Sequence, residues 1–158
     1  MARQIQIGVI GGRDVSPEMI KAAESVGQLI AERNAILICG GLGGVMEAAC
    51  RGVKKAGGTT VGILPVASKE EANPYVDIVI PTDMGIARNA IVVHSSDGVI
   101  AVNGGYGTLS EIAFALQLCV PLVVLKSWGI DASVISAEDP EEAVETLFKL
   151  VQERSVRQ

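Results

Sequence analysis

The chain has 158 residues, a length that suits one domain, and we expect residues 1–158 to form a single domain. Hydrophobic residues make up 49% of the chain and aromatic residues only 3%, so its core must consist of valine, isoleucine, leucine and alanine, as in parallel sheets buried on both faces. With 13 basic and 18 acidic residues, the formal net charge of −5 argues against a broad nucleic-acid-binding surface.

Strand and helix patterns alternate from the N-terminus onward. Residues 5–10 predict the first strand, and Ser16 followed by Pro17 predicts the N-cap and first position of a helix. A strand, a helix and another strand are then predicted at residues 35–39, 45–55 and 59–64. Residues 67–75 are polar and rich in turn formers, which predicts a flexible loop near a binding site.

The second half of the chain continues the alternation. A strand, a helix and a strand are predicted at residues 76–80, 84–94 and 98–102. A helical pattern that includes Leu109 and Ile112 follows, then a strand at 122–125, and Asp139-Pro140 indicates the start of a last helix. The alternation predicts an α/β fold, namely a Rossmann-like, doubly wound, mostly parallel sheet flanked by helices.

Cysteine usage and hydropathy bear on the compartment. Cys39, Cys50 and Cys119 are odd in number and lack metal-ligand spacing, so we expect reduced thiols, no metal site and a cytoplasmic protein. There is no signal-peptide pattern, and no apolar run approaches the roughly 20 residues that span a bilayer, so we expect no membrane association. The high apolar fraction of so short a chain predicts a homo-oligomer, a dimer or larger.

Two glycine clusters each follow a predicted strand and precede a predicted helix. Glycines let backbone N–H groups approach an anion, and the N-terminus of a helix favours negative charge. Because ligands of such sheets lie at the carboxyl ends of the strands, we expect the two turns to converge on one phosphorylated, nucleotide-like ligand. The residues expected to bind it are Gly40, Gly41, Gly43 and Gly44 in the first cluster and Gly104, Gly105, Gly107 and Thr108 in the second.

A structural interpretation of the same glycines stays open. They also suit tight strand-to-helix turns and, in the first cluster, close packing of a helix on a strand. We expect the first strand-to-helix turn, with Gly11, Gly12 and Ser16, to line the same edge of the sheet.

Several nucleotide-binding motifs are excluded. Met46 stands where a dinucleotide-binding fingerprint requires its third glycine, and the third predicted strand ends in Leu64-Pro65 without an acidic residue for a ribose. The chain also lacks a Walker-type Gly-x4-Gly-Lys-Ser/Thr sequence and a Gly-x-Ser-x-Gly nucleophile elbow. The single histidine argues against a zinc cluster.

Three segments together resemble a known family. They are ICGGLGGVMEAACRGVKKAGGTTVGILP, TDMGIARN and NGGYGTLSE, in this order along the chain. They resemble the family labelled "possible lysine decarboxylase", which includes the Lonely Guy cytokinin-activating phosphoribohydrolases and a branch similar to molybdenum cofactor carrier proteins. The resemblance covers nearly the whole chain. Nothing in the sequence provides a recognisable site for pyridoxal phosphate, so we reject the decarboxylase label itself.

The departures from the Lonely Guy motifs are informative. The Lonely Guy sequence Pro-Gly-Gly-x-Gly-Thr-x-x-Glu is found here at residues 103–111, with Asn103 in place of the proline. The Arg-Lys pair of those enzymes is found here as Arg88-Asn89, which removes one cation near the ligand. Both departures look closer to the carrier-like branch and put hydrolase activity in question.

The resemblance implies roles for Arg88 and Glu111. Arg88 would orient the ligand, and Glu111 would stabilise a cationic sugar during N-glycosidic cleavage. Each residue also has a structural interpretation. Glu111 with Thr108 matches a capping box at a helix start, and Arg88, in an otherwise apolar segment, needs a partner such as Glu47 or Glu111.

Two functions from different classes remain open. The first is binding of a phosphorylated nucleotide-like ligand, with hydrolysis of nucleoside 5′-monophosphates if the protein is an enzyme. The alternative is a non-catalytic carrier of molybdenum cofactor or a related phosphorylated pterin. In either case we expect Met46 and Asn89 to flank the base or pterin, although Met46 also suits the core. No cofactor is expected to be required, and the expected partner is a small phosphorylated ligand.

Overall fold

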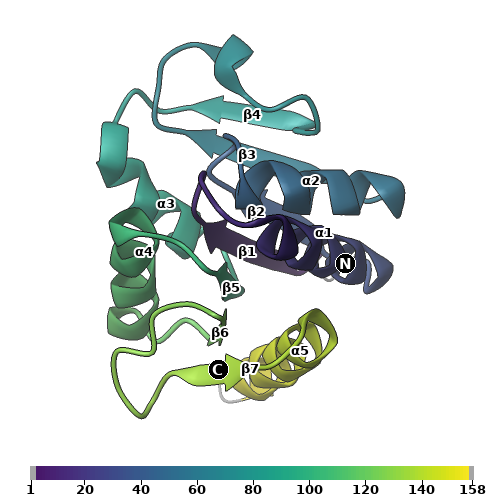
Figure 1. The fold of residues 1–158 in the computed structure, drawn as a ribbon, viewed down its shortest axis with the longest axis vertical. Helices are drawn as coiled ribbons and strands as arrows, with labels where there is room; N and C mark the ends of the chain where they lie inside the picture. Colours follow the sequence, from purple (N-terminus) through teal and green to yellow (C-terminus); the bar gives the residue numbers. More distant parts are fainter. Residues whose placement is uncertain (1–2, 157–158) are drawn as a thin grey trace.

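The computed structural model describes residues 3–156, which form a seven-stranded parallel sheet with helices on both faces (Figure 1). The strands are β1 (Gln6–Gly11), β2 (Ile36–Cys39), β3 (Thr60–Leu64), β4 (Ile78–Pro81), β5 (Gly98–Val102), β6 (Leu122–Leu125) and β7 (Ile135–Ala137). The helices are α1 (Pro17–Glu32), α2 (Val45–Lys55), α3 (Arg88–His94), α4 (Tyr106–Gln117) and α5 (Pro140–Val156), with 3₁₀ turns η1 (Lys69–Glu71) and η2 (Gly85–Ala87). The predicted fold class is confirmed.

The strand order creates a topological switch point. The order across the sheet is β4-β3-β2-β1-β5-β6-β7, and every neighbouring pair is parallel. The chain therefore leaves β1 toward β2 on one side and leaves β5 toward β6 on the other. Helices α1, α2 and α5 cover one face, whereas α3 and α4 cover the other (Figure 1). In doubly wound sheets, ligands bind where the connections diverge in this way, here between the carboxyl ends of β1 and β5.

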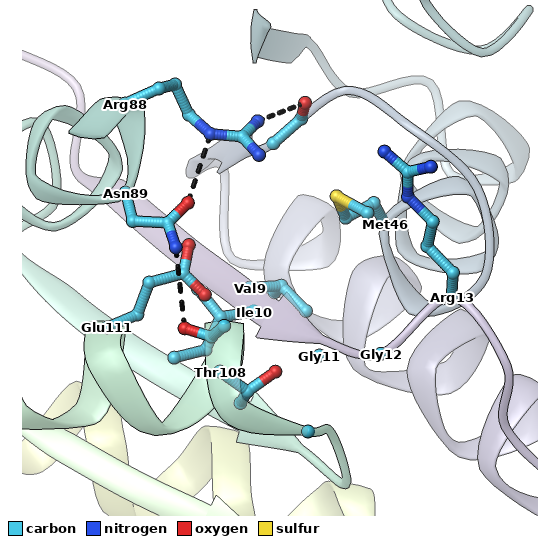
Figure 2. A pocket seen from close by; sticks show the side chains of 13 residues that line it. Val9, Ile10, Gly11, Gly12, Arg13, Met46, Arg88, Asn89, Thr108 and Glu111 are labelled. Atoms are coloured by element: carbon cyan, nitrogen blue, oxygen red, sulfur yellow. Dashed lines mark hydrogen bonds between the residues drawn. The ribbon is translucent and has the colours of Figure 1, made fainter. Parts of the chain in front are cut away.

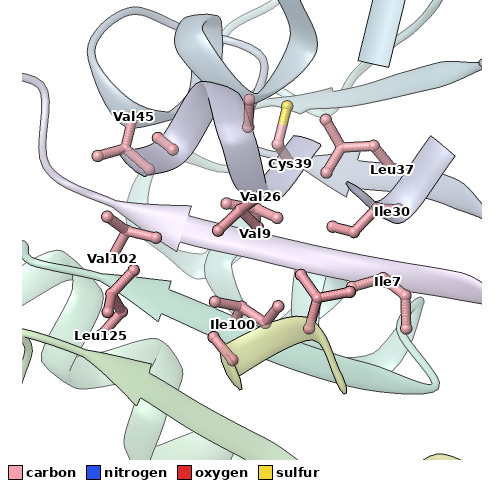
Figure 3. Close-up of a cluster of buried hydrophobic side chains, with 14 of the residues drawn as sticks. Ile7, Val9, Val26, Ile30, Leu37, Cys39, Val45, Ile100, Val102 and Leu125 are labelled. Atoms are coloured by element: carbon pink, nitrogen blue, oxygen red, sulfur yellow. The ribbon is translucent and has the colours of Figure 1, made fainter. Parts of the chain in front are cut away.

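The core contains the aliphatic side chains that the composition predicts. Figure 3 shows the layer between the sheet and helices α1, α2 and α5, where strand residues such as Ile7 and Ile100 meet Val26 and Ile30 of α1. These four side chains are fully buried. Burial of aliphatic side chains on both faces accounts for the continuous apolar runs of the central strands.

Helices α1 and α2 touch through glycine. A Cβ atom added at Gly27 would lie 2.0 Å from the carbonyl oxygen of Ala49, and one at Gly52 would lie 1.9 Å from that of Glu24. The two backbones therefore approach more closely than side chains would permit. This contact fixes α2, and with it the turn that follows β2.

One predicted helix begins later than expected, and one strand was missed. The helix predicted at residues 84–94 begins only at Arg88, because Gly85 has a positive φ angle of 56° that a right-handed helix does not allow. Met84 and Ile86 are consequently 50% and 73% exposed. Strand β7 was not predicted. It is a three-residue edge strand whose first two residues are exposed, so it has no apolar run.

Smaller differences lie at element ends. Helix α4 begins at Tyr106, one turn before the apolar pattern, and the loop predicted at 67–75 contains the 3₁₀ turn η1. Ser16 caps α1 as predicted, because the backbone N–H of Met19 donates to its Oγ at 3.4 Å. Among the helices of residues 3–156, none combines the length and apolar character needed to cross a membrane.

Candidate functional site

A cavity of about 230 Å³ lies at the switch point between β1 and β5 (Figure 2). Its walls come from the end of β1, the turn after β2, the start of α3 and the first turns of α4. The lining residues are Val9, Ile10, Gly11, Gly12, Arg13, Gly40, Met46, Arg88, Asn89, Gly105, Gly107, Thr108 and Glu111. A larger groove of about 530 Å³, between α4, β7 and α5, contains none of the predicted site residues.

The N-terminus of α4 offers unpaired donors to this cavity. Gly105 is the N-cap, and no side chain caps the helix. Within residues 3–156, the backbone N–H groups of Tyr106, Gly107 and Thr108 meet no acceptor, whereas that of Leu109 donates to Gly105. Gly107 and Thr108 line the cavity, and Tyr106 precedes them at the same helix end. Amides without an acceptor at a positive helix end, as here within residues 3–156, form the kind of cradle that binds phosphate.

Glycine is required at one position of this turn. Gly104 has a φ of +110°, and a Cβ there would lie 2.1 Å from Oγ1 of Thr108. The turn is also supported from outside, because Nε1 of Trp128 donates to the carbonyl oxygens of Gly104 (3.1 Å) and Gly105 (3.2 Å). Gly104 does not line the cavity but shapes the turn that does.

Arg88 is held by backbone carbonyl groups. Its Nη1 donates to the carbonyl oxygens of Gly40 and Ile63, both at 2.6 Å, and its Nε donates to Oδ1 of Asn89 at 3.2 Å. Burial lowers the pKa of Arg88. The alternative in which Arg88 pairs with Glu47 or Glu111 is not observed: within residues 3–156, no carboxylate oxygen lies within 4.0 Å of this guanidinium.

Asn89 connects helices α3 and α4. Its Nδ2 donates to Oγ of Ser110 at 3.1 Å and lies 3.5 Å from the carbonyl oxygen of Gly107. Together with the bond from Nε of Arg88, these contacts fix the amide against the first turn of α4. Asn89 therefore orients the wall of the cavity, and its amide lies beside the carboxyl group of Glu111 (Figure 2).

Glu111 does not belong to a capping box. Since α4 begins at Tyr106, Thr108 is its third residue rather than its N-cap, and Glu111 lies in the second turn. The side chain is only 8% exposed and points into the cavity (Figure 2). Burial raises its pKa to about 8, and the nearby charge of Arg88 opposes this only in part. At neutral pH the carboxyl group is therefore mostly protonated and can donate a hydrogen bond.

The first glycine cluster contributes less to the cavity than expected. Gly40 lines it, and a Cβ there would lie 2.6 Å from Nη1 of Arg88, so a side chain at this position would displace the guanidinium group. Met46 lines it too. Gly41, Gly43 and Gly44 lie outside the cavity. Close packing of the chain explains Gly41 and Gly44, since added Cβ atoms would clash with Leu64 and with the Gly12–Arg13 backbone, respectively.

The sequence predicted only some of the cavity-lining residues in the first strand-to-helix turn. Because β1 lies between β2 and β5, its end forms the floor between the two glycine clusters. Gly11 and Gly12 line the cavity as expected, but Ser16 does not. Arg13 was missed. Its only sequence signal is that it follows the two glycines. The expected ligand-binding roles of all these residues stay predictions.

Comparison with known proteins identifies relatives along most of the chain. The model of the SLOG cluster4 family matches residues 4–156. A protein of Archaeoglobus fulgidus is 51% identical over 140 residues, which cover 89% of this chain and 92% of the relative. The cytokinin riboside 5′-monophosphate phosphoribohydrolase of Mycobacterium tuberculosis is 34% identical over 125 residues, or 71% of this chain, but the match spans only 65% of that enzyme's length.

Solved structures include two similar proteins that are described as binding or carrying molybdenum cofactor. The molybdenum cofactor binding protein of Rippkaea orientalis has a TM-score of 0.90 and 40% sequence identity, with 96% of this chain and 99% of that chain covered. The molybdenum cofactor carrier protein of Chlamydomonas reinhardtii has a TM-score of 0.86 and 36% identity, with 95% and 99% covered. The predicted resemblance to a Lonely Guy-like, carrier-like branch is confirmed.

Proposed function

Since the chain belongs to the SLOG cluster4 family, we propose that its switch-point cavity binds a small phosphorylated ligand. The observation that carries the proposal is the set of three amides that meet no acceptor within residues 3–156, at Tyr106, Gly107 and Thr108, beside a cavity that also contains a buried carboxyl group. The phosphate would accept hydrogen bonds from these amides. The cavity is smaller than the ~300–1,000 Å³ typical of ligand sites, so the rest of the ligand would extend toward solvent.

The function that the geometry supports best is a non-catalytic carrier of a phosphorylated pterin such as molybdenum cofactor. The similarity to the Rippkaea orientalis and Chlamydomonas reinhardtii proteins over nearly their whole lengths supports this choice. The protonation state of Glu111 supports the carrier function as well. A protonated carboxyl group offers one donor and one acceptor, which suits the amide-like edge of a pterin ring.

A second candidate is a phosphoribohydrolase that acts on nucleoside 5′-monophosphates. The sequence similarity to the Mycobacterium tuberculosis enzyme favours it, as does the presence of Arg88 and Glu111 in one cavity. In this reaction Glu111 would have to be ionised to stabilise a cationic sugar. With a pKa near 8, Glu111 would reach this charged form mainly above neutral pH.

One experiment separates the two candidates. The purified protein is incubated with AMP between pH 6 and pH 9, and released adenine is measured by chromatography beside an E111Q variant. A parallel sample is incubated with molybdenum cofactor, and retained molybdenum is measured after gel filtration. The carrier predicts retained molybdenum and no adenine above the E111Q background. Adenine release that E111Q abolishes would establish the hydrolase, and failure of both assays would reject the binding site.

We also propose that the protein forms a homo-oligomer. Edge strand β4 and the following turn expose large apolar side chains, with Ile78 51%, Ile80 43% and Ile86 73% exposed. Neighbouring exposed apolar side chains of this kind often mark a subunit contact. Native mass spectrometry tests the proposal, since a monomer at micromolar concentration would reject it. The same spectra report any ligand retained through purification.

A further inference from the structure

Two arginine residues line the cavity, and among the described residues 3–156 hydrogen-bond partners are found for Arg88 but not for Arg13. Three N–H groups of Arg88 are engaged by Gly40, Ile63 and Asn89. The guanidinium group of Arg13, in contrast, forms no ion pair with any carboxylate of residues 3–156. Arg88 thus uses its hydrogen bonds to hold other parts of the protein in place, whereas the guanidinium group of Arg13 can still bind a ligand.

The backbone of Arg13 has a fixed position beside the cavity. The carbonyl oxygen of Gly12 accepts a hydrogen bond from the first residue of α2, Val45, at 3.0 Å. The turn also packs on Gly44 so closely that a Cβ there would lie 2.4 Å from the carbonyl oxygen of Arg13. The backbone from which the side chain extends is therefore held in place. Figure 2 shows the guanidinium group of Arg13 beside Met46, across the cavity from Glu111.

The cavity has an excess of positive charge at neutral pH. Arg13 carries a positive charge that adds to the lowering of the pKa of Arg88, which is caused mainly by burial, and both arginine residues line the cavity. Glu111 is the only acidic residue among the lining residues. Because Glu111 is largely protonated at neutral pH, the cavity has an excess of positive charge that a ligand with more than one negative charge would neutralise.

We infer that Arg13 is a specificity-determining residue that binds a phosphomonoester dianion together with the free amides of α4, and that Arg88 is a positioning residue. This inference rests on the proposed function and names the group that the site recognises. The guanidinium fork of Arg13 would donate to phosphate oxygens that the amides leave free. A ligand without the phosphate would gain nothing from Arg13.

Binding measurements with matched ligands and variants test the inference. AMP and adenosine are titrated by calorimetry into the wild-type protein, R13Q, R13K and the control K149Q, which removes one exposed positive charge from α5. R13Q should bind AMP about 10- to 100-fold more weakly, as expected for loss of a hydrogen-bonded charge, and R13K should lose less. The affinity for adenosine should be the same in all four proteins, and K149Q should match the wild type.

The failures of the two proposals are distinguishable. If the wild type binds AMP and R13Q binds it equally well, the inference about Arg13 is rejected while the binding site stands. If the wild type binds neither AMP nor inorganic phosphate and also retains no molybdenum cofactor, the proposed function and the inference are rejected together. Urea unfolding of R13Q should match that of the wild type, because the side chain is exposed and has no ion-pair partner in residues 3–156.

Chemical modification gives an independent readout. Phenylglyoxal reacts with accessible guanidinium groups, and the modified peptides are identified by mass spectrometry. Arg13 should react quickly and be protected by saturating inorganic phosphate, whereas Arg88, which is buried and bonded to carbonyl groups, should stay unmodified with or without phosphate. Equal modification of Arg13 with and without phosphate would overturn the inference.

Discussion

The guanidinium group of Arg88 and the carboxyl group of Glu111 line one cavity, but within residues 3–156 no ion pair joins them. Arg88 donates instead to the carbonyl oxygens of Gly40 and Ile63. Glu111 is therefore buried without a neutralising contact, and its pKa rises to about 8. This separation gives the two residues different expected effects on stability.

Replacing Glu111 with glutamine should stabilise the protein increasingly as the pH rises. The pKa of Glu111 is about 8 in the folded protein and 4.5 as the ordinary value, so between these limits the folded state binds more protons than the unfolded state. Wild-type stability therefore falls as the pH rises through this window, whereas E111Q does not titrate. We expect the difference in unfolding free energy to grow by on the order of 3 kcal/mol.

Urea unfolding at several pH values between 4.5 and 8 measures this difference. The control is E153Q, since Glu153 is exposed on α5. Its stability should stay parallel to that of the wild type over the whole pH range. Parallel curves for E111Q as well would mean that the carboxyl group is already ionised in the folded protein.

Replacing Arg88 with alanine should destabilise the fold, in contrast to the same change at Arg13. R88A leaves the carbonyl oxygens of Gly40 and Ile63 without their shared donor. A buried group left unpaired costs about 1–3 kcal/mol, so we expect R88A to lose ~2–4 kcal/mol of unfolding free energy. R13A should change it by less than about 0.5 kcal/mol, as exposed substitutions usually do. Equal unfolding curves for the two variants would contradict the different roles of the arginines.

Much of the fold could be predicted because local patterns determine it. Strand β5 was predicted with its observed bounds because residues 98–102 form an unbroken run of apolar residues and glycine. The structure buries all five of them. Strand β7 could not be predicted, because Ile135 and Ser136 are exposed on an edge strand and form no periodic pattern. The positive φ of Gly85, which delays α3, likewise has no signal beyond the presence of a glycine.

The candidate site could be predicted where it lies within one local motif. Gly105, Gly107, Thr108 and Glu111 belong to a single strand-to-helix segment, so their proximity follows from the chain itself. The position of Arg13 depends on β1 lying between β2 and β5. Hydrophobic periodicity does not encode the order of strands in a sheet, so sequence patterns alone could not predict that Arg13 lies at the cavity.

Alanine substitutions at two adjacent glycines should have very different effects. A Cβ at Gly104 would lie 2.1 Å from Oγ1 of Thr108, and the φ of +110° is strained for any L side chain. At Gly105, an added Cβ would meet nothing within 4 Å. We expect G104A to lose ~2–3 kcal/mol of unfolding free energy and G105A less than about 1 kcal/mol. Chemical denaturation checks this, and similar losses would show that the turn relaxes to accept a side chain.

An alanine at Gly27 should separate helices α1 and α2. The added Cβ would lie 2.0 Å from the carbonyl oxygen of Ala49, and a backbone atom cannot move aside as a flexible side chain can. We expect G27A to lose at least ~2 kcal/mol, within the range of overpacked cores. G129A, at which an added Cβ has open space, serves as the control. Thermal unfolding measures both, and an unchanged melting temperature for G27A would disprove the close contact.

The fluorescence of Trp128 should report ligand binding at the α4 turn. Trp128 is the only tryptophan, so the signal has a single source. Its Nε1 donates to the carbonyl oxygens of Gly104 and Gly105, and its ring stacks on that of Tyr106 with the centroids 6.1 Å apart. An anion that binds the adjacent amides should alter the polarity around the indole and shift its emission.

Titration with inorganic phosphate and AMP should therefore change the emission spectrum with the same midpoint that calorimetry gives. A W128F variant would lose the indole donor and keep the aromatic contact with Tyr106. Because the carbonyl groups of Gly104 and Gly105 would lose this donor, the turn should be less rigid, and we expect W128F to bind AMP more weakly by at most about 10-fold, the worth of one hydrogen bond. Emission that stays constant while calorimetry detects binding would show that the ligand lies away from the α4 turn.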